Sequence, residues 1–272
     1  MGIAREAAPE IDRLVLSLWN LGTARSGRLA ELAHEGGLES LDLLPHFADF
    51  LLAGALTREL ATLRLRYRRS SKVVARLDEL KAMHFISEGE NGLAASPTLR
   101  PLLKGLLAAR AEKAAEMWGD HDEDVATAME GAEKISHAAS VDHVVAVVHL
   151  KLPEPADPYH RLGHRLLTLR YIRQHDHAEA WLARDLTAPE MVLMTQLWHT
   201  NQVEEPNDDP ARLVELGLVE ADLLRLTVTG REVREAIETE TDERAQHAFD
   251  VLDGTAGTRF LAALRRLPGT IG

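Results

Sequence analysis

Several residue types and sequence features are missing or scarce in this chain of 272 residues. It has no cysteine, which excludes disulfide frameworks, thiolate nucleophiles and cysteine-ligated zinc or iron–sulfur sites. Aromatic residues make up only 4% of the chain, so Leu, Ala and Val must fill the core, and that composition favours helices. The sequence also lacks a signal-peptide pattern and an apolar run of about eighteen residues. We therefore expect a mainly α, cytoplasmic protein that spans no membrane.

Positive charge is also scarce, and it is unevenly distributed. The formal net charge is −12, which by itself argues against a general polyanion binder. Residues 1–110 contain 15 Lys and Arg against 13 Asp and Glu, a net charge of +2, so the rest of the chain carries −14. If the protein contacts nucleic acid, only its first part has the charge to do so.

The spacing of apolar residues in residues 1–118 indicates one helical module that contains a short hairpin. Helical periodicity or a largely apolar pattern is found in residues 11–20, 25–34, 41–56, 57–65, 70–83 and 98–118. Ser70 or Ser71 is well placed to cap the helix expected over residues 70–83. The Asn91-Gly92 pair favours a tight turn between two short strands. The order of helix, turn, helix and hairpin predicts a winged helix.

The remainder of the chain divides into an expected linker and a second module. Residues 119–158 contain an acidic patch, a β-like run at Val141–Leu150 and three prolines, which are typical of a linker. Residues 159–272 return to helical patterns with a short hairpin, and we predict a second, degenerate winged-helix module there.

An internal repeat supports this division. Residues 75–80 (ARLDEL) match residues 211–216 (ARLVEL), and residues 93–100 match residues 224–231 in the same order along the chain. The repeat predicts tandem winged-helix modules with long connecting helices in a pseudo-dimeric arrangement. Helices rich in Leu, Ala, Glu and Arg also resemble one another without a duplication, so this alternative stays open.

Cations are concentrated in the predicted helix-turn-helix. Arginines in the turn would lie where phosphates meet the start of the recognition helix, and the first residues of that helix would lie nearest to base edges. The predicted DNA-binding residues are Arg64, Arg66, Arg68, Arg69, Ser70, Ser71, Lys72 and Arg76. The alternative is a solvated face that pairs with the acidic second half of the chain.

Residues 56–103 resemble the DNA-binding core of MarR-type transcriptional regulators. The resemblance rests on the opening Leu56-Thr57-x-x-Leu60, on the Ser-x-x-x-x-Arg-Leu-x-x-Leu pattern of residues 71–80 and on the hairpin around Asn91-Gly92. Residues 186–191 and 226–242 look like the C-terminal part of MarR-like helix-turn-helix proteins. The resemblance implies winged-helix modules and binding to double-stranded DNA.

The sequence departs from the MarR pattern at two places. The tip of the first hairpin carries Glu88 and Glu90, where MarR-type wings usually bring Arg or Lys toward the minor groove. In the second module, residues 203–209 (VEEPNDD) occupy the region of an expected second helix and cationic recognition-helix start. We therefore expect that the second module does not read DNA.

Other residues suggest binding of a small molecule rather than catalysis. Arg170, Arg173, His177 and Trp181 have the spacing to line a pocket for an anionic or aromatic ligand between the modules, although packing of a helix is the alternative. His160 and His164 could share a metal, but no third ligand is fixed by spacing, so we predict no metal and no cofactor.

Two functional hypotheses follow from the sequence. The first is a ligand-responsive, MarR-like transcriptional regulator, with double-stranded DNA, a small-molecule effector and a second copy of the chain as possible partners. The second is a small-molecule-binding or sequestering protein that keeps a winged-helix scaffold and does not bind DNA. The chain has no nucleophile elbow and no glycine-rich phosphate loop after a strand, so we predict that it is not an enzyme.

Overall fold

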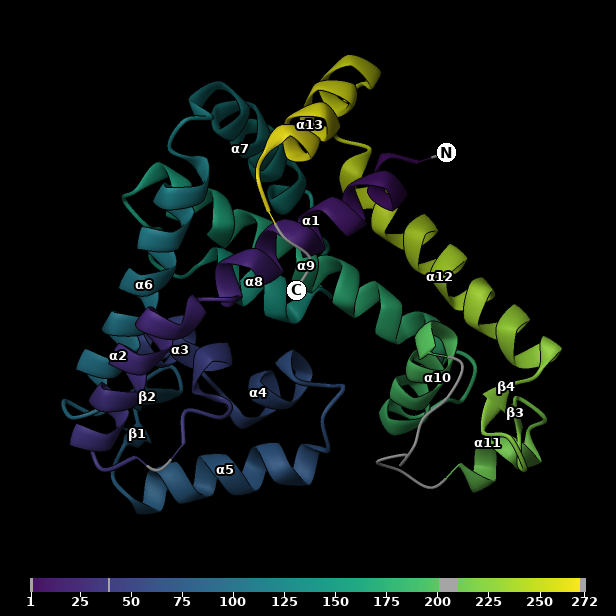
Figure 1. The fold of residues 1–272 in the computed structure, drawn as a ribbon, viewed down its shortest axis with the longest axis horizontal. Helices are drawn as coiled ribbons and strands as arrows, with labels where there is room; N and C mark the ends of the chain where they lie inside the picture. The colour runs from purple at the N-terminus through teal and green to yellow at the C-terminus, as the bar shows by residue number, and fades with distance from the viewer. Residues whose placement is uncertain (1, 39, 201–209, 270–272) are drawn as a thin grey trace.

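The computed structural model describes residues 2–38, 40–200 and 210–269, and this part of the chain is mainly helical. The molecule has a triangular outline, with a helical body at the top and a lobe at each lower corner (Figure 1). The described elements are, in chain order, α1 (Ile3–Trp19), α2 (Gly22–Glu35), α3 (Leu44–Ala53), α4 (Arg58–Arg64), α5 (Ser70–Ala82), β1 (Ile86–Glu88), β2 (Leu93–Ala95), α6 (Arg100–Trp118), α7 (Asp122–His137), α8 (Val144–Leu150), α9 (Pro158–Leu182), α10 (Ala188–Thr200), α11 (Ala211–Glu215), β3 (Val219–Glu220), β4 (Arg225–Leu226), α12 (Val228–Phe249) and α13 (Gly254–Arg266).

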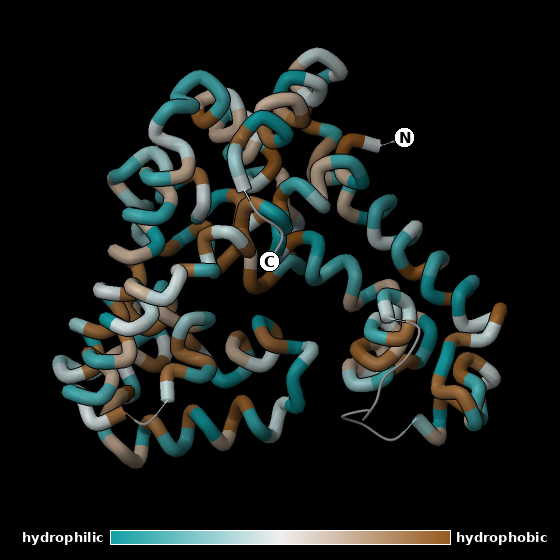
Figure 2. Tube along the Cα trace, in the orientation of Figure 1, coloured by the Kyte–Doolittle hydropathy of each residue, from teal (hydrophilic) through white to brown (hydrophobic). Residues whose placement is uncertain are grey.

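The body is built around α9, its longest helix. This helix packs against α1, α6, α7 and α12, while α13 covers α1 and α7. Close helix packing depends on small residues, because a Cβ atom added at Gly131 of α7 would lie 2.3 Å from the Phe260 ring of α13. Apolar residues gather where these helices meet and polar residues face outward (Figure 2). The body and the first lobe share one continuous hydrophobic core.

The first lobe has the element order predicted for a winged helix: α3, α4, α5, the β1–β2 hairpin and α6. Thr57 caps α4, because its hydroxyl accepts a hydrogen bond from the backbone N–H of Leu60 at 3.0 Å. Strand β1 pairs antiparallel with β2, with Ser87 opposite Ala94. Leu56, just before α4, forms an isolated antiparallel β-bridge with Leu93 of the hairpin.

The prediction that Ser70 or Ser71 caps α5 was wrong. Both serines already lie in the first turn of the helix, and Arg69 occupies the cap position without a capping side-chain hydrogen bond. The arginine-rich turn before α5 therefore leads directly into helical backbone.

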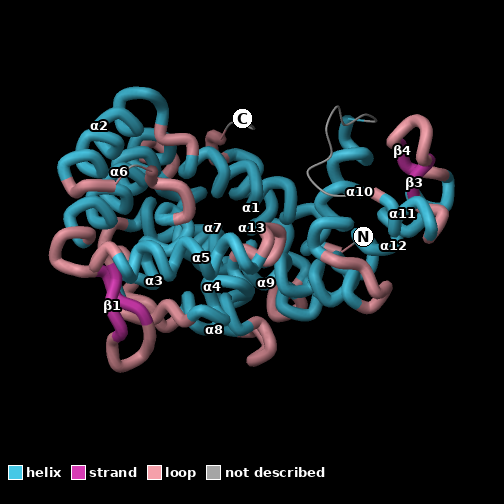
Figure 3. Tube along the Cα trace, turned by 90° about the horizontal axis from the view of Figure 1, so that it is seen from below, coloured by secondary structure: helices cyan, strands magenta, loops and turns pink. Residues whose placement is uncertain are grey.

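The second lobe contains α10, α11, the β3–β4 hairpin and the start of α12. It has a separate hydrophobic core that includes Trp181 from the end of α9 and Ile237 from α12. The two hairpins lie at opposite ends of the molecule (Figure 3). The acidic segment 203–209, which we expected to replace a recognition-helix start, lies outside the described residues.

Residues 119–158 are not the irregular linker that we expected, because they contain α7 and α8. The acidic patch is the first turn of α7, where Asp122, Glu123 and Asp124 lie near the N-terminal end of the helix dipole. The predicted β-like run is also wrong, since Val144–Leu150 forms helix α8, which packs against α9. Tertiary packing therefore overrides the strand preference of its valines.

Candidate nucleic-acid interface

The candidate interface is the exposed face of the α4–α5 unit in the first lobe. Helix α5 turns Val73, Leu77 and Leu80 into the core, so its opposite face lies at the surface. The turn before it is exposed at Arg68 and Arg69, and it is hydrophilic in Figure 2. Two helices joined by a turn, with one face of the second helix exposed, are compatible with a helix-turn-helix.

Five of the eight predicted DNA-binding residues are exposed. They are Arg68, Arg69, Ser70, Ser71 and Lys72. Within the described part of the chain, the side chains of Arg68 and Lys72 have no hydrogen-bond or ion-pair partner. These five residues are contiguous, so they form one small patch at the start of α5.

The other three predicted residues are held by contacts within the protein. Arg64 is only 4% exposed, and its Nε donates to the Tyr171 hydroxyl at 2.7 Å, so it does not face a phosphate. Arg66 is half-buried with Nε on the Leu63 carbonyl, and burial lowers its pKa. The Arg76 guanidinium donates to the Ser40 carbonyl at 3.0 Å and pairs with Glu79 at 2.6 Å.

Carboxylates neutralise further cations around α5. Arg58 donates to Asp78, and this hydrogen bond holds the pKa of the Asp78 carboxyl below its usual value. The Lys81 ammonium donates to Glu88 of β1 at 2.7 Å. The positive surface is therefore smaller than the sequence indicates and is centred on Arg68 and Lys72.

The wing retains its acidic character in the structure. Glu88 and Glu90 are both exposed at the hairpin tip, so the expectation that this tip would be repelled by phosphate stands as a prediction. Gly92 has a φ of 141°, a backbone conformation that side chains other than glycine rarely adopt, and an added Cβ would lie 2.9 Å from the Leu56 carbonyl. The tight turn thus depends on this glycine.

A comparison with family models matched residues 95–271 to a helix-turn-helix family. The chain belongs to this helix-turn-helix family. It is therefore a regulator of the DNA-binding, helix-turn-helix type. No curated protein and no solved structure was found to match the chain.

The part of this helix-turn-helix protein that matches the family model is mainly the body and the second lobe. The match begins at Ala95 in β2, so α4 and α5 lie before it, whereas α10, α11 and the β3–β4 hairpin lie within it. Among the described residues, no helix is long and apolar enough to cross a membrane.

The four residues predicted to line an effector pocket are held by neighbouring helices. The guanidinium of Arg170 donates to Asp12 of α1 at 2.7 Å, and that of Arg173 donates to Glu238 at 2.9 Å and Asp242 at 3.0 Å, both on α12. These two arginines therefore connect α9 to α1 and α12, and their role in binding a ligand stays a prediction.

His177 and Trp181 link α9 to both lobes. The Tyr67 hydroxyl lies 2.5 Å from His177 Nδ1, and His177 Nε2 lies 3.3 Å from Glu238. Burial alone would raise the pKa of Glu238, but contacts with His177, Arg234 and Arg173 outweigh burial and hold it well below its usual value. Trp181 is 4% exposed in the second core.

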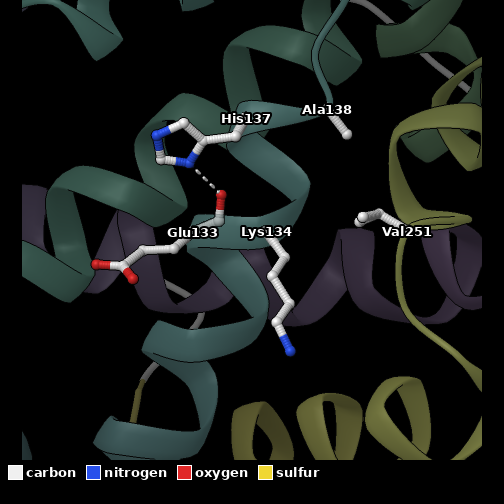
Figure 4. A pocket seen from close by; sticks show the side chains of 5 residues that line it. All are labelled: Glu133, Lys134, His137, Ala138 and Val251. Carbon is white, nitrogen blue, oxygen red and sulfur yellow. Dashed lines mark hydrogen bonds between the residues drawn. The ribbon is translucent and has the colours of Figure 1, made fainter.

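Two pockets on the described residues lie away from these four side chains. One pocket of about 490 Å³ is lined by residues at the C-terminal end of α7, among them His137, and by Val251 beyond α12, and His137 Nδ1 lies 2.7 Å from the Glu133 carbonyl oxygen (Figure 4). A smaller hollow lies between α7 and α13. Neither contains any of the four predicted ligand residues, and no group of His, Asp or Glu in the described ranges could hold a metal ion.

The sequence analysis missed a set of buried polar side chains behind the α4–α5 unit. Arg64 and Arg110 lie over the ring of Trp19, at 5.6 Å and 4.5 Å from its centroid. His149 stacks on His164 at 3.9 Å between ring centroids. An available signal was the presence of charged and histidine residues within otherwise apolar helical faces, since such residues are seldom buried without a partner.

Proposed function

We propose that this helix-turn-helix protein is a MarR-like transcriptional regulator whose α5 enters the major groove of double-stranded DNA. The observation that supports this proposal is the patch of Arg68, Arg69 and Lys72 at the exposed start of α5. Cations and helix N-terminal amides at that position meet phosphates when a recognition helix docks, and Ser70 and Ser71 lie beside them to reach base edges.

The proposal includes a tandem winged-helix organisation and a non-catalytic role. Both lobes contain a helix with a hairpin and a long helix after it, which supports two modules in one chain. A small-molecule effector and a homodimer are further parts of the proposal, and the effector would act by binding one arrangement of the lobes more tightly than another.

The second candidate is a protein that binds small molecules on this scaffold without contacting DNA. The observation that favours it is the loss of cations from the interface, since Arg64 is buried and Arg58, Arg76 and Lys81 each contact a carboxylate. The acidic wing tip would further weaken attraction to phosphate.

Duplex DNA binding at a series of salt concentrations separates the two candidates. For the regulator, binding weakens as salt rises, and the variant Arg68→Ala/Lys72→Ala reduces the slope of log affinity against log salt by about 0.9 for each lost phosphate contact. The matched control is Lys104→Ala/Arg259→Ala, which removes two exposed cations from α6 and α13 and should keep the wild-type slope. Salt-independent or undetectable binding of the wild-type protein to mixed-sequence duplexes would support the second candidate.

A further inference from the structure

The first lobe and the body meet at a cluster of four side chains that includes two buried arginines. We define this arginine cluster as Arg64, Arg110, Trp19 and His46. Arg64 ends α4 and Arg110 lies on α6, and they are 4% and 6% exposed. Both guanidiniums lie over the indole of Trp19, and the His46 ring is 4.7 Å from the same indole. Four helices that are distant in sequence therefore bring two positive charges to one aromatic ring.

The carboxylates around this cluster do not balance its charge. Asp49 lies 4.0 Å from Arg110, the edge of ion-pair range, and it is the one carboxylate within that range of either arginine among the described residues. Arg110 otherwise donates to the Pro45 carbonyl, and Arg64 donates to the hydroxyl of Tyr171. Guanidinium groups stay charged in proteins, so at least one buried positive charge lacks a counterion.

Three buried polar atoms of the cluster, two of them guanidinium donors, also lack a hydrogen-bond partner among the described residues. In the described part of the chain, Arg64 Nη2, Arg110 Nε and His46 Nδ1 are buried with no partner. Buried polar atoms in folded proteins are almost always satisfied, and leaving charged donors without acceptors is strongly unfavourable. The cluster therefore calls for an acceptor that carries negative charge.

We propose that this cluster binds a small oxyanion, a carboxylate or a phosphate, which accepts hydrogen bonds from Arg64 and Arg110 beside the indole of Trp19. Guanidinium groups match the geometry of both anions, and the aromatic rings exclude water around them. His46 and Asp49 are only partly buried, so the cluster reaches the surface beside them.

The position of the site connects it to the interface. Arg64 lies four residues before Arg68, and its backbone carbonyl accepts a hydrogen bond from Gln174 of α9 at 3.2 Å. An anion that draws the Arg64 side chain toward Arg110 also acts on the turn that presents Arg68. This regulatory consequence rests on the proposed function, whereas anion binding itself does not.

The test uses the full-length protein without DNA. Sodium phosphate and sodium acetate are titrated separately against sodium chloride at equal ionic strength, and binding is followed by calorimetry and by the melting temperature. We expect at least one of the two anions to bind saturably and to raise the melting temperature by a few degrees. The comparison of the two affinities shows whether the site prefers a phosphate or a carboxylate.

Two variants locate the site. Arg110→Met and Arg64→Met each remove a guanidinium while retaining an apolar stem, and either one should lower anion affinity at least tenfold. Arg234→Met is the matched control, because it removes an equally buried arginine of α12 that pairs with Glu238, and it should leave anion affinity unchanged. Circular dichroism establishes that each variant is folded, and Trp19→Phe offers a second readout through the loss of any anion-dependent change in tryptophan fluorescence.

The outcomes distinguish this inference from the proposed function. If neither anion binds more tightly than chloride in calorimetry, and neither raises the melting temperature above that in chloride, then water satisfies the unpaired donors and the inference is wrong. Unchanged anion affinity in both Met variants would also overturn it. Anion binding without any DNA binding would support the inference and contradict the proposed function. DNA binding without anion binding would contradict the inference and leave the proposed function supported.

Discussion

His46 gives a quantitative test of the electrostatics behind the α4–α5 unit. Burial, followed by the positive charges of Arg64, Arg68, Arg110 and Arg170, lowers the pKa of its imidazole from 6.5 to about 3. The folded protein therefore keeps His46 neutral at pH values where the unfolded chain protonates it. Between these two pKa values the unfolded state binds the extra proton, so the stability provided by neutral His46 is complete above pH 6.5 and is lost as the pH falls.

The magnitude follows from the unfolded pKa. At pH 5.5, one unit below it, protonation of this one side chain on unfolding lowers the free energy of unfolding by about 1.4 kcal/mol relative to pH 8. The variant His46→Asn has no group to protonate, so its free energy of unfolding should fall by about 1.4 kcal/mol less over the same interval. Loss of packing against Trp19 affects both pH values equally and cancels in this difference.

The assay is urea unfolding at pH 8 and pH 5.5 for the wild-type protein and for His46→Asn. His34→Asn, on the exposed face of α2, is the matched control and should follow the wild-type pH dependence, because its ring is in water in the fold. Burial also lowers the pKa of His149, but its contribution is present in all three proteins. Equal losses for wild type and His46→Asn would refute the reasoning.

Two further substitutions test the contacts that hold the body together. Glu238→Gln removes the carboxylate that pairs with Arg234 and one of the two that pair with Arg173. Because the Glu238 side chain is 37% exposed, we expect a loss of about 2 kcal/mol, between the values for surface and buried pairs. Urea unfolding at pH 7 measures this loss of stability, and Glu235→Gln, at an exposed position of the same helix, is the control. Equal free energies of unfolding for Glu238→Gln and the wild-type protein would contradict the prediction. Gly131→Ala should cost about 1–3 kcal/mol, because its Cβ would overlap the Phe260 ring. A thermal melt unchanged from wild type would mean that α7 and α13 pack less closely than described.

Local signals account for the parts of the fold that could be predicted from the sequence. The Asn91-Gly92 turn and the helical periodicity of residues 57–65 act over a few residues, and they placed the hairpin and α4 correctly. The acidic start of α7 was misread because a run of carboxylates is typical of both a linker and a helix N-terminus. Only packing against α9 and α13 separates the two.

The fate of individual cations could not be predicted, because it depends on distant partners. Arg64 and Arg68 lie four residues apart and look equivalent in the sequence, yet Arg64 meets Tyr171 of α9 while Arg68 remains at the surface. The spacing of Arg170, Arg173 and His177 predicted a ligand pocket, which stays a prediction. Their partners are carboxylates of α1 and α12, which sequence periodicity does not reveal.

The burial of Arg64 sets a limit on how this protein can hold DNA. Of the predicted arginines and lysines, Arg68, Arg69 and Lys72 are the ones that remain at the exposed start of α5. If each contacts one phosphate, the slope of log affinity against log salt from this lobe is at most about −2.7, shallow for a specific regulator. A steeper measured slope requires cations from outside this patch, either from the second lobe, where the family match lies, or from a second copy of the chain. The slope of a variant that lacks all three cations, Arg68→Ala/Arg69→Ala/Lys72→Ala, then measures that outside contribution directly.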